Sequence, residues 1–106
     1  MSDSKFTVDL SGQTAIVTGA SQGLGKAMAI ALGSAGAKVA CVARSEEKLG
    51  DTVKEITDAG GTAKAFPCDV TSRESVDGVV NAVTDEWEKL DILINNAGIT
   101  RDTLLP

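Results

Sequence analysis

Hydrophobic residues in this chain form four short runs, separated by longer segments in which they recur at helical spacing. The short runs predict buried strands at about 13–18, 38–43, 62–68 and 90–94. The longer segments predict helices at about 23–35, 45–59 and 72–88. Strands that alternate with helices are typical of a doubly wound parallel α/β sheet, here of the form βαβαβαβ. Right-handed crossovers that return past the first strand give the strand order 3-2-1-4.

Each predicted helix carries an aliphatic stripe that we expect to pack on the sheet. The stripes are Leu24, Met28, Ala31 and Ala35, then Leu49, Val53 and Ile56, then Val76, Val79, Val80, Val83 and Trp87. Gly36 is placed to end the first helix, and Ser45 is placed to cap the second. Thr71 and Glu74 have the spacing of a capping box for the third helix. Pro67 has no backbone N–H, which predicts that the third strand lies at an edge of the sheet.

A glycine-rich turn joins the first predicted strand to the first predicted helix. Its sequence is Thr18-Gly19-Ala20-Ser21-Gln22-Gly23-Leu24-Gly25. The start of the helix directs backbone N–H groups and the positive end of the helix dipole above the sheet, and both favour a phosphate. Glycines admit such a group because no Cβ stands in the way. We also expect Gly25 to permit close packing of the helix on the first strand.

The spacing of this turn excludes two common phosphate-binding patterns. A P-loop would need Ser or Thr after Gly25-Lys26, where this chain has Ala27, and a glycine where it has Ala20. The dinucleotide pattern G-x-G-x-x-G also fails, because these glycines are spaced G-x-x-x-G-x-G. Taken alone, the turn leaves open the alternative of a tight connection that binds no ligand.

Arg44 follows the second predicted strand, about 20 residues after the turn, where dinucleotide-binding folds read the adenosine ribose. An acid at this place would bind the free ribose hydroxyls of NAD, whereas the planar guanidinium of Arg44 matches a 2′-phosphate. Ala43, the preceding residue, has no carboxylate that would repel this phosphate. We therefore expect NADP(H) rather than NAD(H). The alternative is a solvated arginine at the start of a helix.

The carboxyl ends of the four predicted strands carry Gly19, Arg44, Asp69 and Asn95. In a doubly wound sheet these ends lie along one edge, and ligands bind in the crevice outside it. We therefore expect these residues to share one ligand site.

Composition narrows the functional classes. The chain has 106 residues, of which 42% are apolar and 24% charged, as is ordinary for one soluble globular domain. Its net charge of −5 argues against nucleic-acid and anionic-membrane partners. No apolar run approaches the roughly 20 residues that span a bilayer. The N-terminus lacks the pattern of a signal peptide, so we expect a cytoplasmic protein.

Side chains that bind metals or perform covalent catalysis are scarce. Cys41 and Cys68 lie on separate predicted strands and are expected to be buried thiols rather than metal ligands. The absence of His excludes a His-based metal site and a Ser-His-Asp triad in this chain, and no metal site is expected. The chain also contains no Tyr.

Three segments together resemble the short-chain dehydrogenase/reductases. They are the glycine turn from Thr18 to Gly25, the pair Asp69-Val70, and Asn95-Asn96-Ala97-Gly98 at its distance from the turn. The continuation from Ile99 to Leu105 resembles the 3-oxoacyl-[acyl-carrier-protein] reductases in particular. The resemblance implies a Rossmann fold and an NADPH-dependent reduction of a 3-oxoacyl thioester carried by acyl-carrier protein, in fatty-acid biosynthesis.

The resemblance also implies a set of cofactor-binding residues. They are Gly19, Ser21, Gln22, Gly23, Leu24, Gly25, Arg44, Asp69, Val70, Asn95, Ala97 and Gly98. The turn would hold the pyrophosphate and the adenosine ribose, Asp69 would accept a hydrogen bond from the adenine amino group, and the Val70 backbone would border the adenine. Asn95, Ala97 and Gly98 would line the cofactor near its ribose, with Ile99 toward the nicotinamide. Asn96 would tie neighbouring strands together.

Alternatives stay open at several of these positions. Some NADP(H)-dependent members carry a basic residue where this chain has Gln22, so the expected preference for NADP(H) rests on Arg44 alone. For Asp69 the alternative is a charge at the N-terminus of a helix. For Asn95 and Asn96 it is the formation of a turn.

The resemblance covers only the cofactor half of the family. These reductases use a Ser, a Tyr, a Lys and a further Asn beyond this point, so no catalytic residue is assigned here. We therefore expect residues 1–106 to be one cofactor-binding domain, truncated before the catalytic half of a longer enzyme and inactive alone. The alternatives are a nucleotide-binding module without chemistry and a folding fragment that binds nothing well.

The missing half has a structural consequence. The face under the third helix would lack its remaining helices, and the fourth strand would lack its next neighbour. Because edge strands and exposed apolar faces associate, we expect the isolated chain to be marginally stable and to self-associate. We expect the parent enzyme to be a homo-oligomer.

Overall fold

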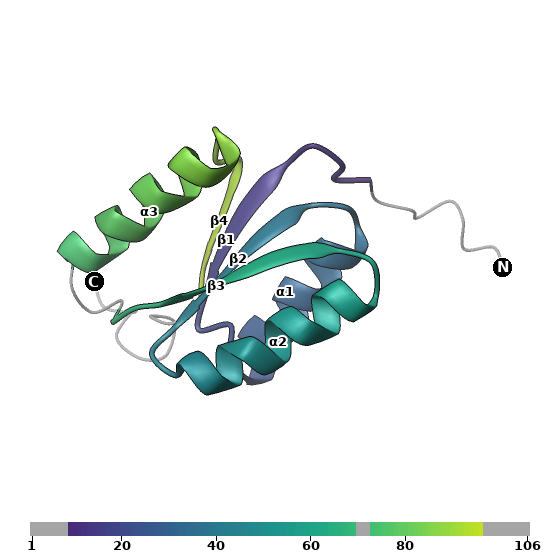
Figure 1. Cartoon of the computed structure of the whole chain (residues 1–106), viewed down its shortest axis with the longest axis horizontal. Coiled ribbons are helices and arrows are strands. Elements are labelled where there is room, and N and C mark those ends of the chain that lie inside the picture. The colour runs from purple at the N-terminus through teal and green to yellow at the C-terminus, as the bar shows by residue number, and fades with distance from the viewer. Residues whose placement is uncertain (1–8, 70–72, 97–106) are drawn as a thin grey trace, which may run out of the picture.

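The computed structural model describes residues 9–69 and 73–96, which form a sheet with helices on both faces (Figure 1). The elements in chain order are β1 (Thr14–Thr18), α1 (Gly23–Ser34), β2 (Lys38–Ala43), α2 (Glu46–Asp58), β3 (Thr62–Pro67), α3 (Arg73–Trp87) and β4 (Ile92–Asn95). The predicted boundaries agree to within one residue for every element except β4.

The sheet has the predicted strand order, β3-β2-β1-β4, and all of its pairings are parallel. In the central strand β1, Ile16 pairs with Ala40 of β2 and with Leu93 of β4. β3 lies at an edge, as Pro67 indicated. Beyond Pro67 the N–H of Cys68 donates a 2.8 Å hydrogen bond to the Ala43 carbonyl, which fixes the chain as it leaves the sheet.

β4 begins at Ile92 and not at Leu90, so the predicted start was wrong. The residue before the strand, Asp91, is held to β1 by a reciprocal pair of bonds. The Thr14 N–H donates to Asp91 Oδ2 at 2.9 Å, and the Asp91 N–H donates to the Thr14 carbonyl at 2.9 Å. The side chain of Asp91 therefore takes a place that a backbone carbonyl takes in a regular ladder. The Thr14 N–H is also the main reason that the pKa of Asp91 is lowered.

The helices cover opposite faces of the sheet, with α1 and α2 on one side and α3 on the other (Figure 1). The larger core, under α1 and α2, is centred on Val17, Val39, Cys41, Leu49 and Ile56. The smaller core, under α3, consists of Ile16, Ala40, Val42, Val79 and Val83. Neighbouring strand residues thus supply opposite cores, as the pleat of a strand requires.

The buried face of α1 differs from the prediction. Its buried residues are Gly25, Ala29 and Gly33. The predicted stripe was wrong: Leu24 is 63% exposed, Ala31 is exposed, and Met28 and Ala35 are only half-buried. A Cβ on Gly33 would lie 2.6 Å from Cγ2 of Ile56, so α1 approaches α2 more closely than long side chains allow. Hydrophobic spacing favours the long side chains, whereas close helix packing buries the small ones.

The other helices agree with their predicted faces and ends. Leu49 and Ile56 of α2 are buried, and Val53 packs against them. The Ser45 hydroxyl accepts a 3.2 Å hydrogen bond from the Lys48 N–H and so caps α2 as predicted. Gly36 follows α1 with a φ of +104°, a conformation that glycine tolerates. Thr71, in the predicted capping box of α3, lies outside the described residues.

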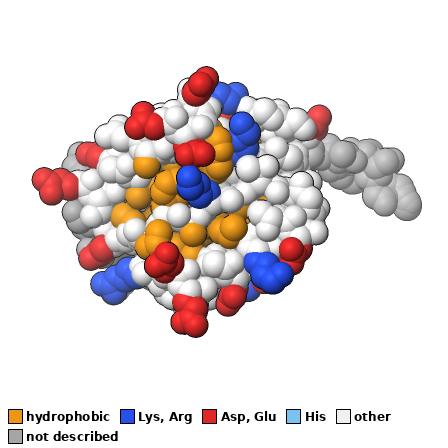
Figure 2. All heavy atoms as spheres, in the orientation of Figure 1, with side chains coloured by type: hydrophobic (Ala, Val, Ile, Leu, Met, Phe, Trp, Pro, Cys, Tyr) orange, Lys and Arg blue, Asp and Glu red, His pale blue; other side chains and the backbone are white. Residues whose placement is uncertain are grey.

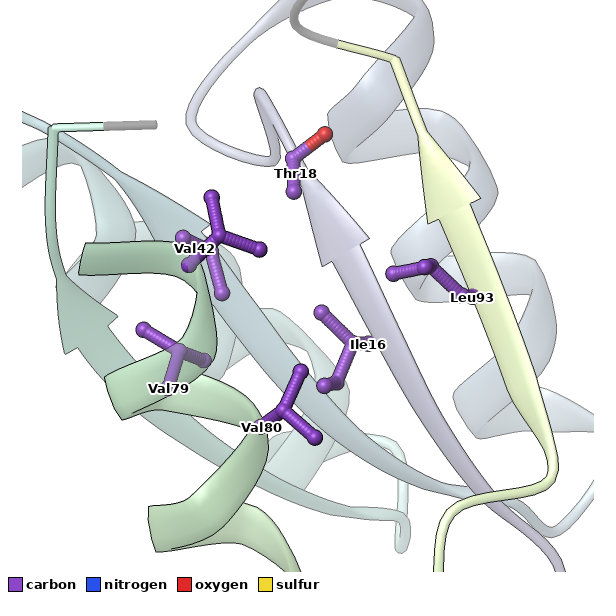
Figure 3. Close-up of a pocket in the computed structure, with 7 residues that line it drawn as sticks. Ile16, Thr18, Val42, Val79, Val80 and Leu93 are labelled. Atoms are coloured by element: carbon purple, nitrogen blue, oxygen red, sulfur yellow. The ribbon is translucent and has the colours of Figure 1, made fainter. Parts of the chain in front are cut away.

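α3 and the sheet enclose a mainly aliphatic cavity, in which Val79 and Val80 face Ile16 and Val42 (Figure 3). The lining residues are Ile16, Thr18, Val42, Val76, Val79, Val80 and Leu93. The predicted stripe of α3 is therefore confirmed, since Val83 is buried and Trp87 also packs on this core. Leu93 on β4 is 53% exposed, so the apolar face under α3 is incompletely covered toward β4.

Apolar side chains also reach the surface between α3 and α2, where β3 forms the edge of the sheet (Figure 2). A groove there is lined by Ala65, Phe66, Pro67, Cys68, Ser75, Gly78, Val79 and Ala82. Lys64 Nζ lies 3.1 Å from Glu86 Oε1 and links β3 to α3. The predicted self-association concerned the face under α3 and the edge at β4, and it stays a prediction. Within residues 9–69 and 73–96, no helix combines the length and apolar character needed to cross a membrane.

Candidate cofactor site

The carboxyl ends of the four strands bring together residues that are far apart in the sequence. Thr18, the last residue of β1, pairs with Val42 of β2 and with Asn95 of β4. The next residue, Gly19, therefore lies on the same edge of the sheet as Arg44, Asp69 and Asn95, which follow or end the other strands. The predicted edge is thus formed as expected.

Two glycines of the turn have backbone conformations that other residues rarely adopt. Gly19 has a φ of +66° and Gly23 a φ of +60°. Gly25 serves a different purpose, because a Cβ there would lie 2.0 Å from the Gly19 carbonyl oxygen and 2.8 Å from Asn96 Nδ2. The close approach that we predicted at Gly25 is therefore made to the turn and to Asn96, rather than to the body of β1.

The start of α1 keeps the features that favour an anion. Gln22 occupies the N-cap position in an extended conformation, and its side chain makes no capping hydrogen bond. Instead, Gln22 Oε1 accepts a 3.3 Å hydrogen bond from Lys48 Nζ of α2. The first turn of α1 carries no acidic residue. The positive end of the helix dipole is therefore neutralised by neither a capping side chain nor a carboxylate of its own first turn.

Lys26 does not face the turn. Its Nζ lies 2.6 Å from Glu55 Oε2 on α2, and this contact raises the pKa of Lys26. A P-loop lysine would instead reach the phosphates. The geometry of Lys26 thus agrees with the rejection of a P-loop.

The backbone of the turn is anchored at Ala20, which is fully buried. The Ala20 N–H donates to the Val42 carbonyl at 3.1 Å, and the Ala20 carbonyl accepts from Thr52 Oγ1 at 2.9 Å. Thr52 was missed in the sequence analysis. Its signal was a hydroxyl beside Val53 on the predicted inner stripe of α2, where an aliphatic residue would be ordinary.

Arg44 and Asp69 face each other at the edge of the site. Arg44 Nε lies 3.9 Å from Asp69 Oδ1, and the two side chains are 75% and 51% exposed. An ion pair this long and this exposed is worth little. The guanidinium of Arg44 can therefore exchange this contact for a phosphate, and both side chains border the same space.

Asn95 and Asn96 each contact a neighbouring segment at this edge of the sheet. Asn95 Oδ1 accepts a 3.1 Å hydrogen bond from Thr18 Oγ1, so it is Asn95 that links β4 to β1. Asn96 lies beside Gly25 at the turn. Val70, Ala97, Gly98 and Ile99 lie outside the described residues.

The described residues contain no cluster of three or more His, Cys, Asp or Glu that could hold a metal ion. Cys41 and Cys68 are both free thiols. Cys41 is buried as predicted, and its burial raises the pKa of the thiol to about 12. Cys68 is only half-buried.

A parallel doubly wound sheet, with a glycine turn opening the first helix and polar residues at the strand ends, defines the class of α/β nucleotide-binding folds. A family model described as short chain dehydrogenase matches residues 13–105, and the chain belongs to this family.

Relatives and solved structures agree with this assignment. The chain is 48% identical over 98 residues to a 3-oxoacyl-[acyl-carrier-protein] reductase of Vibrio cholerae, covering 92% of this chain and 39% of the relative. It is 45% identical over 97 residues to the reductase of the same name from Synechocystis sp., covering 91% and 39%. A metagenomic short-chain oxidoreductase, solved in complex with NADP, superposes with a TM-score of 0.81 at 44% identity, covering 85% of this chain and 41% of that one.

Relatives with other names also match. A 3beta-hydroxysteroid dehydrogenase of Eggerthella lenta is 45% identical over 92 residues, covering 86% of this chain and 35% of the relative. The chain spans about two fifths of the length of the first two relatives.

Proposed function

We propose that this chain is the NADP(H)-binding half of a short-chain reductase. The proposal rests on one observation. The N-terminus of α1, which has no side-chain cap, and Arg44 lie at the same edge of the sheet. The helix N-terminus suits a diphosphate, and the exposed guanidinium suits a 2′-phosphate. The metagenomic oxidoreductase solved with NADP supports this assignment of the cofactor.

In the proposed complex, each segment of the edge holds one part of the cofactor. The turn from Gly19 to Gly25 binds the diphosphate and the adenosine ribose. Ser21, Gln22, Gly23 and Leu24 are the other residues of the turn that we assign to this site. Arg44 binds the 2′-phosphate, while Asp69 and Val70 border the adenine. Asn95, Ala97 and Gly98 line the cofactor near its ribose, and Ile99 lies toward the nicotinamide. These roles are the ones that the family resemblance implies, and the placement of Gly19, Arg44 and Asp69 at one edge of the sheet supports them.

The reaction that we propose for the parent enzyme is the reduction of a 3-oxoacyl thioester on acyl-carrier protein, in fatty-acid biosynthesis in the cytoplasm. Bound NADPH supplies the hydride for such a reduction. The residues of this chain bind and orient the cofactor, and none of them corresponds to the family's proton-donating Tyr, because the chain contains no Tyr. The proton-donating Tyr, with its Ser and Lys, belongs to the remaining part of the enzyme, so we expect this chain alone to be inactive.

Support for the substrate class is the high identity to two 3-oxoacyl-[acyl-carrier-protein] reductases. The cofactor half does not by itself define a substrate, and the steroid dehydrogenase matches almost as well. Reading the coding sequence past Pro106 tests the enzyme directly. A Ser followed by Tyr-x-x-x-Lys is the expected result, and a stop codon would favour a nucleotide-binding module without chemistry.

Cofactor binding is tested by titrating the chain with NADPH and NADH while following the nicotinamide fluorescence. A charge-assisted contact to the 2′-phosphate predicts a Kd for NADPH about tenfold lower than for NADH. Equal Kd values for NADPH and NADH would show that Arg44 does not bind the 2′-phosphate. Binding of neither would leave the chain as a folding fragment.

A further inference from the structure

We propose that Thr52, a buried residue of α2, is a positioning residue for the phosphate-binding turn. Its hydroxyl orients the Ala20 carbonyl, and this directs the next amide, that of Ser21, toward the cofactor diphosphate. The proposal rests on the proposed function, and it adds a residue that lies outside the turn and does not touch the cofactor.

Because Thr52 is buried, the hydrogen bond of its hydroxyl is expected to matter for the conformation of the turn. The residue has no exposed surface, and Oγ1 donates to the Ala20 carbonyl at 2.9 Å across 32 residues of sequence. Its neighbours on the inner face of α2, Leu49 and Ile56, belong to the main hydrophobic core. In such surroundings a hydroxyl or a carbonyl without a partner is costly, so this bond holds both groups in place.

The Ala20 residue is held from two directions. Its N–H donates to the Val42 carbonyl of β2, whereas its carbonyl accepts from Thr52 of α2. The peptide bonds of the described residues are all trans. In a trans peptide the N–H points opposite to the carbonyl of the preceding residue. Because the Ala20 carbonyl is directed at α2, the Ser21 N–H is directed away from α2.

The preceding peptide obeys the same geometry and supports this reasoning. The Ala20 N–H is directed at β2, so the Gly19 carbonyl must point away from β2. This oxygen lies beside α1, 2.0 Å from the position that a Cβ on Gly25 would take. Two successive peptide planes at the start of the turn are therefore fixed by β2, α1 and α2 together.

A fixed turn binds its ligand more tightly than a mobile one, because less conformational freedom is lost on binding. Thr52→Val keeps the shape of the side chain and removes the hydroxyl. Thr52→Ser keeps the hydroxyl. Thr57→Val is the matched control, because Thr57 lies on the same helix and its Oγ1 bonds only carbonyls of that helix, those of Val53 and Lys54, in the described structure.

The experiment measures binding of NADPH and of adenosine 2′-monophosphate to the full chain and to these variants. The second ligand has the 2′-phosphate but no diphosphate. We expect Thr52→Val to raise the Kd of NADPH about tenfold and to change the Kd of adenosine 2′-monophosphate less than about twofold. Thr52→Ser and Thr57→Val are expected to bind NADPH within about threefold of wild type. Thr52→Val should also speed hydrogen exchange of the Ser21 amide.

An NADPH Kd that is unchanged in Thr52→Val overturns the proposal, and so does an equal loss for both ligands. If Thr52→Val does not fold, Thr52→Ser decides, because a tenfold rise in its NADPH Kd contradicts a role for the hydroxyl. If the wild-type chain does not bind NADPH, the proposed function fails. Exchange of the Ser21 amide then decides about Thr52, and equal exchange in wild type and Thr52→Val overturns its positioning role.

Discussion

Arg44 Nε lies 3.9 Å from Asp69 Oδ1, although the two residues follow different strands, β2 and β3. The contact places a cation and an anion at the same edge of the sheet, each more than half exposed. An exposed pair of this kind contributes on the order of 0–1 kcal/mol, so a phosphate competes easily for the guanidinium. The relationship thus marks where the proposed 2′-phosphate and adenine lie next to each other.

Replacing Arg44 tests the proposed choice of cofactor. We expect Arg44→Gln to raise the Kd of NADPH about tenfold and to leave the Kd of NADH within about twofold, because only NADPH has the 2′-phosphate. Fluorescence titration measures both values. Lys54→Gln removes another exposed cation, on α2, whose partner in the described structure is Asp58, and it should change neither. Parallel losses for both cofactors would contradict the assignment of Arg44.

Replacing Gly25 tests the packing of α1 on the turn. A Cβ at Gly25 meets the backbone oxygen of Gly19 at 2.0 Å, and this backbone is held through Ala20. We expect Gly25→Ala to lower the free energy of unfolding by about 2 kcal/mol and to weaken NADPH binding. The control is Gly50→Ala on α2, where a Cβ meets nothing within 4 Å. This change should stabilise the chain by roughly 0.5–1 kcal/mol in urea unfolding. Similar stability of both variants would exclude the close contact at Gly25.

The bond between Thr14 and Asp91 predicts a dependence of stability on pH. The Thr14 N–H lowers the pKa of Asp91 below its ordinary value of 3.8. A group whose pKa is lowered on folding contributes stability above its unfolded pKa, and loses it as the pH falls through the folded pKa. We therefore expect the wild type to be more stable than Asp91→Asn above about pH 4, with the difference shrinking on acidification. The midpoints of urea unfolding of both proteins between pH 2 and 7 measure this difference in stability. A difference that grows as the pH falls would contradict the prediction.

The two cysteines should differ in reactivity. Burial raises the pKa of Cys41 to about 12, so the thiol stays protonated near neutral pH, and the side chain has no exposed surface. Cys68 is half-buried at the end of the edge strand. We expect iodoacetamide to label Cys68 in the native chain and Cys41 only after unfolding, as read by mass spectrometry. Cys68→Ser should stay unlabelled until urea is added, and rapid native labelling of that variant would contradict the buried position of Cys41.

Much of the fold was predictable because its signals are local. Alternating strands and helices, the edge position of Pro67 and the cap at Ser45 each follow from a few neighbouring residues. The edge of the site was predictable for the same reason, since the topology fixes where Gly19, Arg44 and Asp69 emerge. The family resemblance added the cofactor and the motif at Asn95.

The errors share one physical cause, which is contact between segments far apart in the chain. The buried face of α1 depends on how closely α2 approaches Gly33. The residues next to Gly33 in the sequence do not indicate that Ile56 packs there. The start of β4 depends on a side chain, that of Asp91, that bonds to Thr14. Thr52 was missed for the same reason, because its hydrogen bond to the Ala20 carbonyl forms only when α2 packs against the turn.

The pairing of Thr14 with Asp91 spans 77 residues and joins β1 to β4. Closing such a long loop costs more conformational entropy than closing a short one, so we expect this contact to form after the local units β1–α1–β2 and α2–β3. During synthesis on the ribosome, we therefore expect one edge of β1 to stay unpaired until β4 has left the exit tunnel. We expect the corner where Asn96 lies beside Gly25 to form only after β4 has paired with β1, so the proposed cofactor site needs this long-range contact before it can bind.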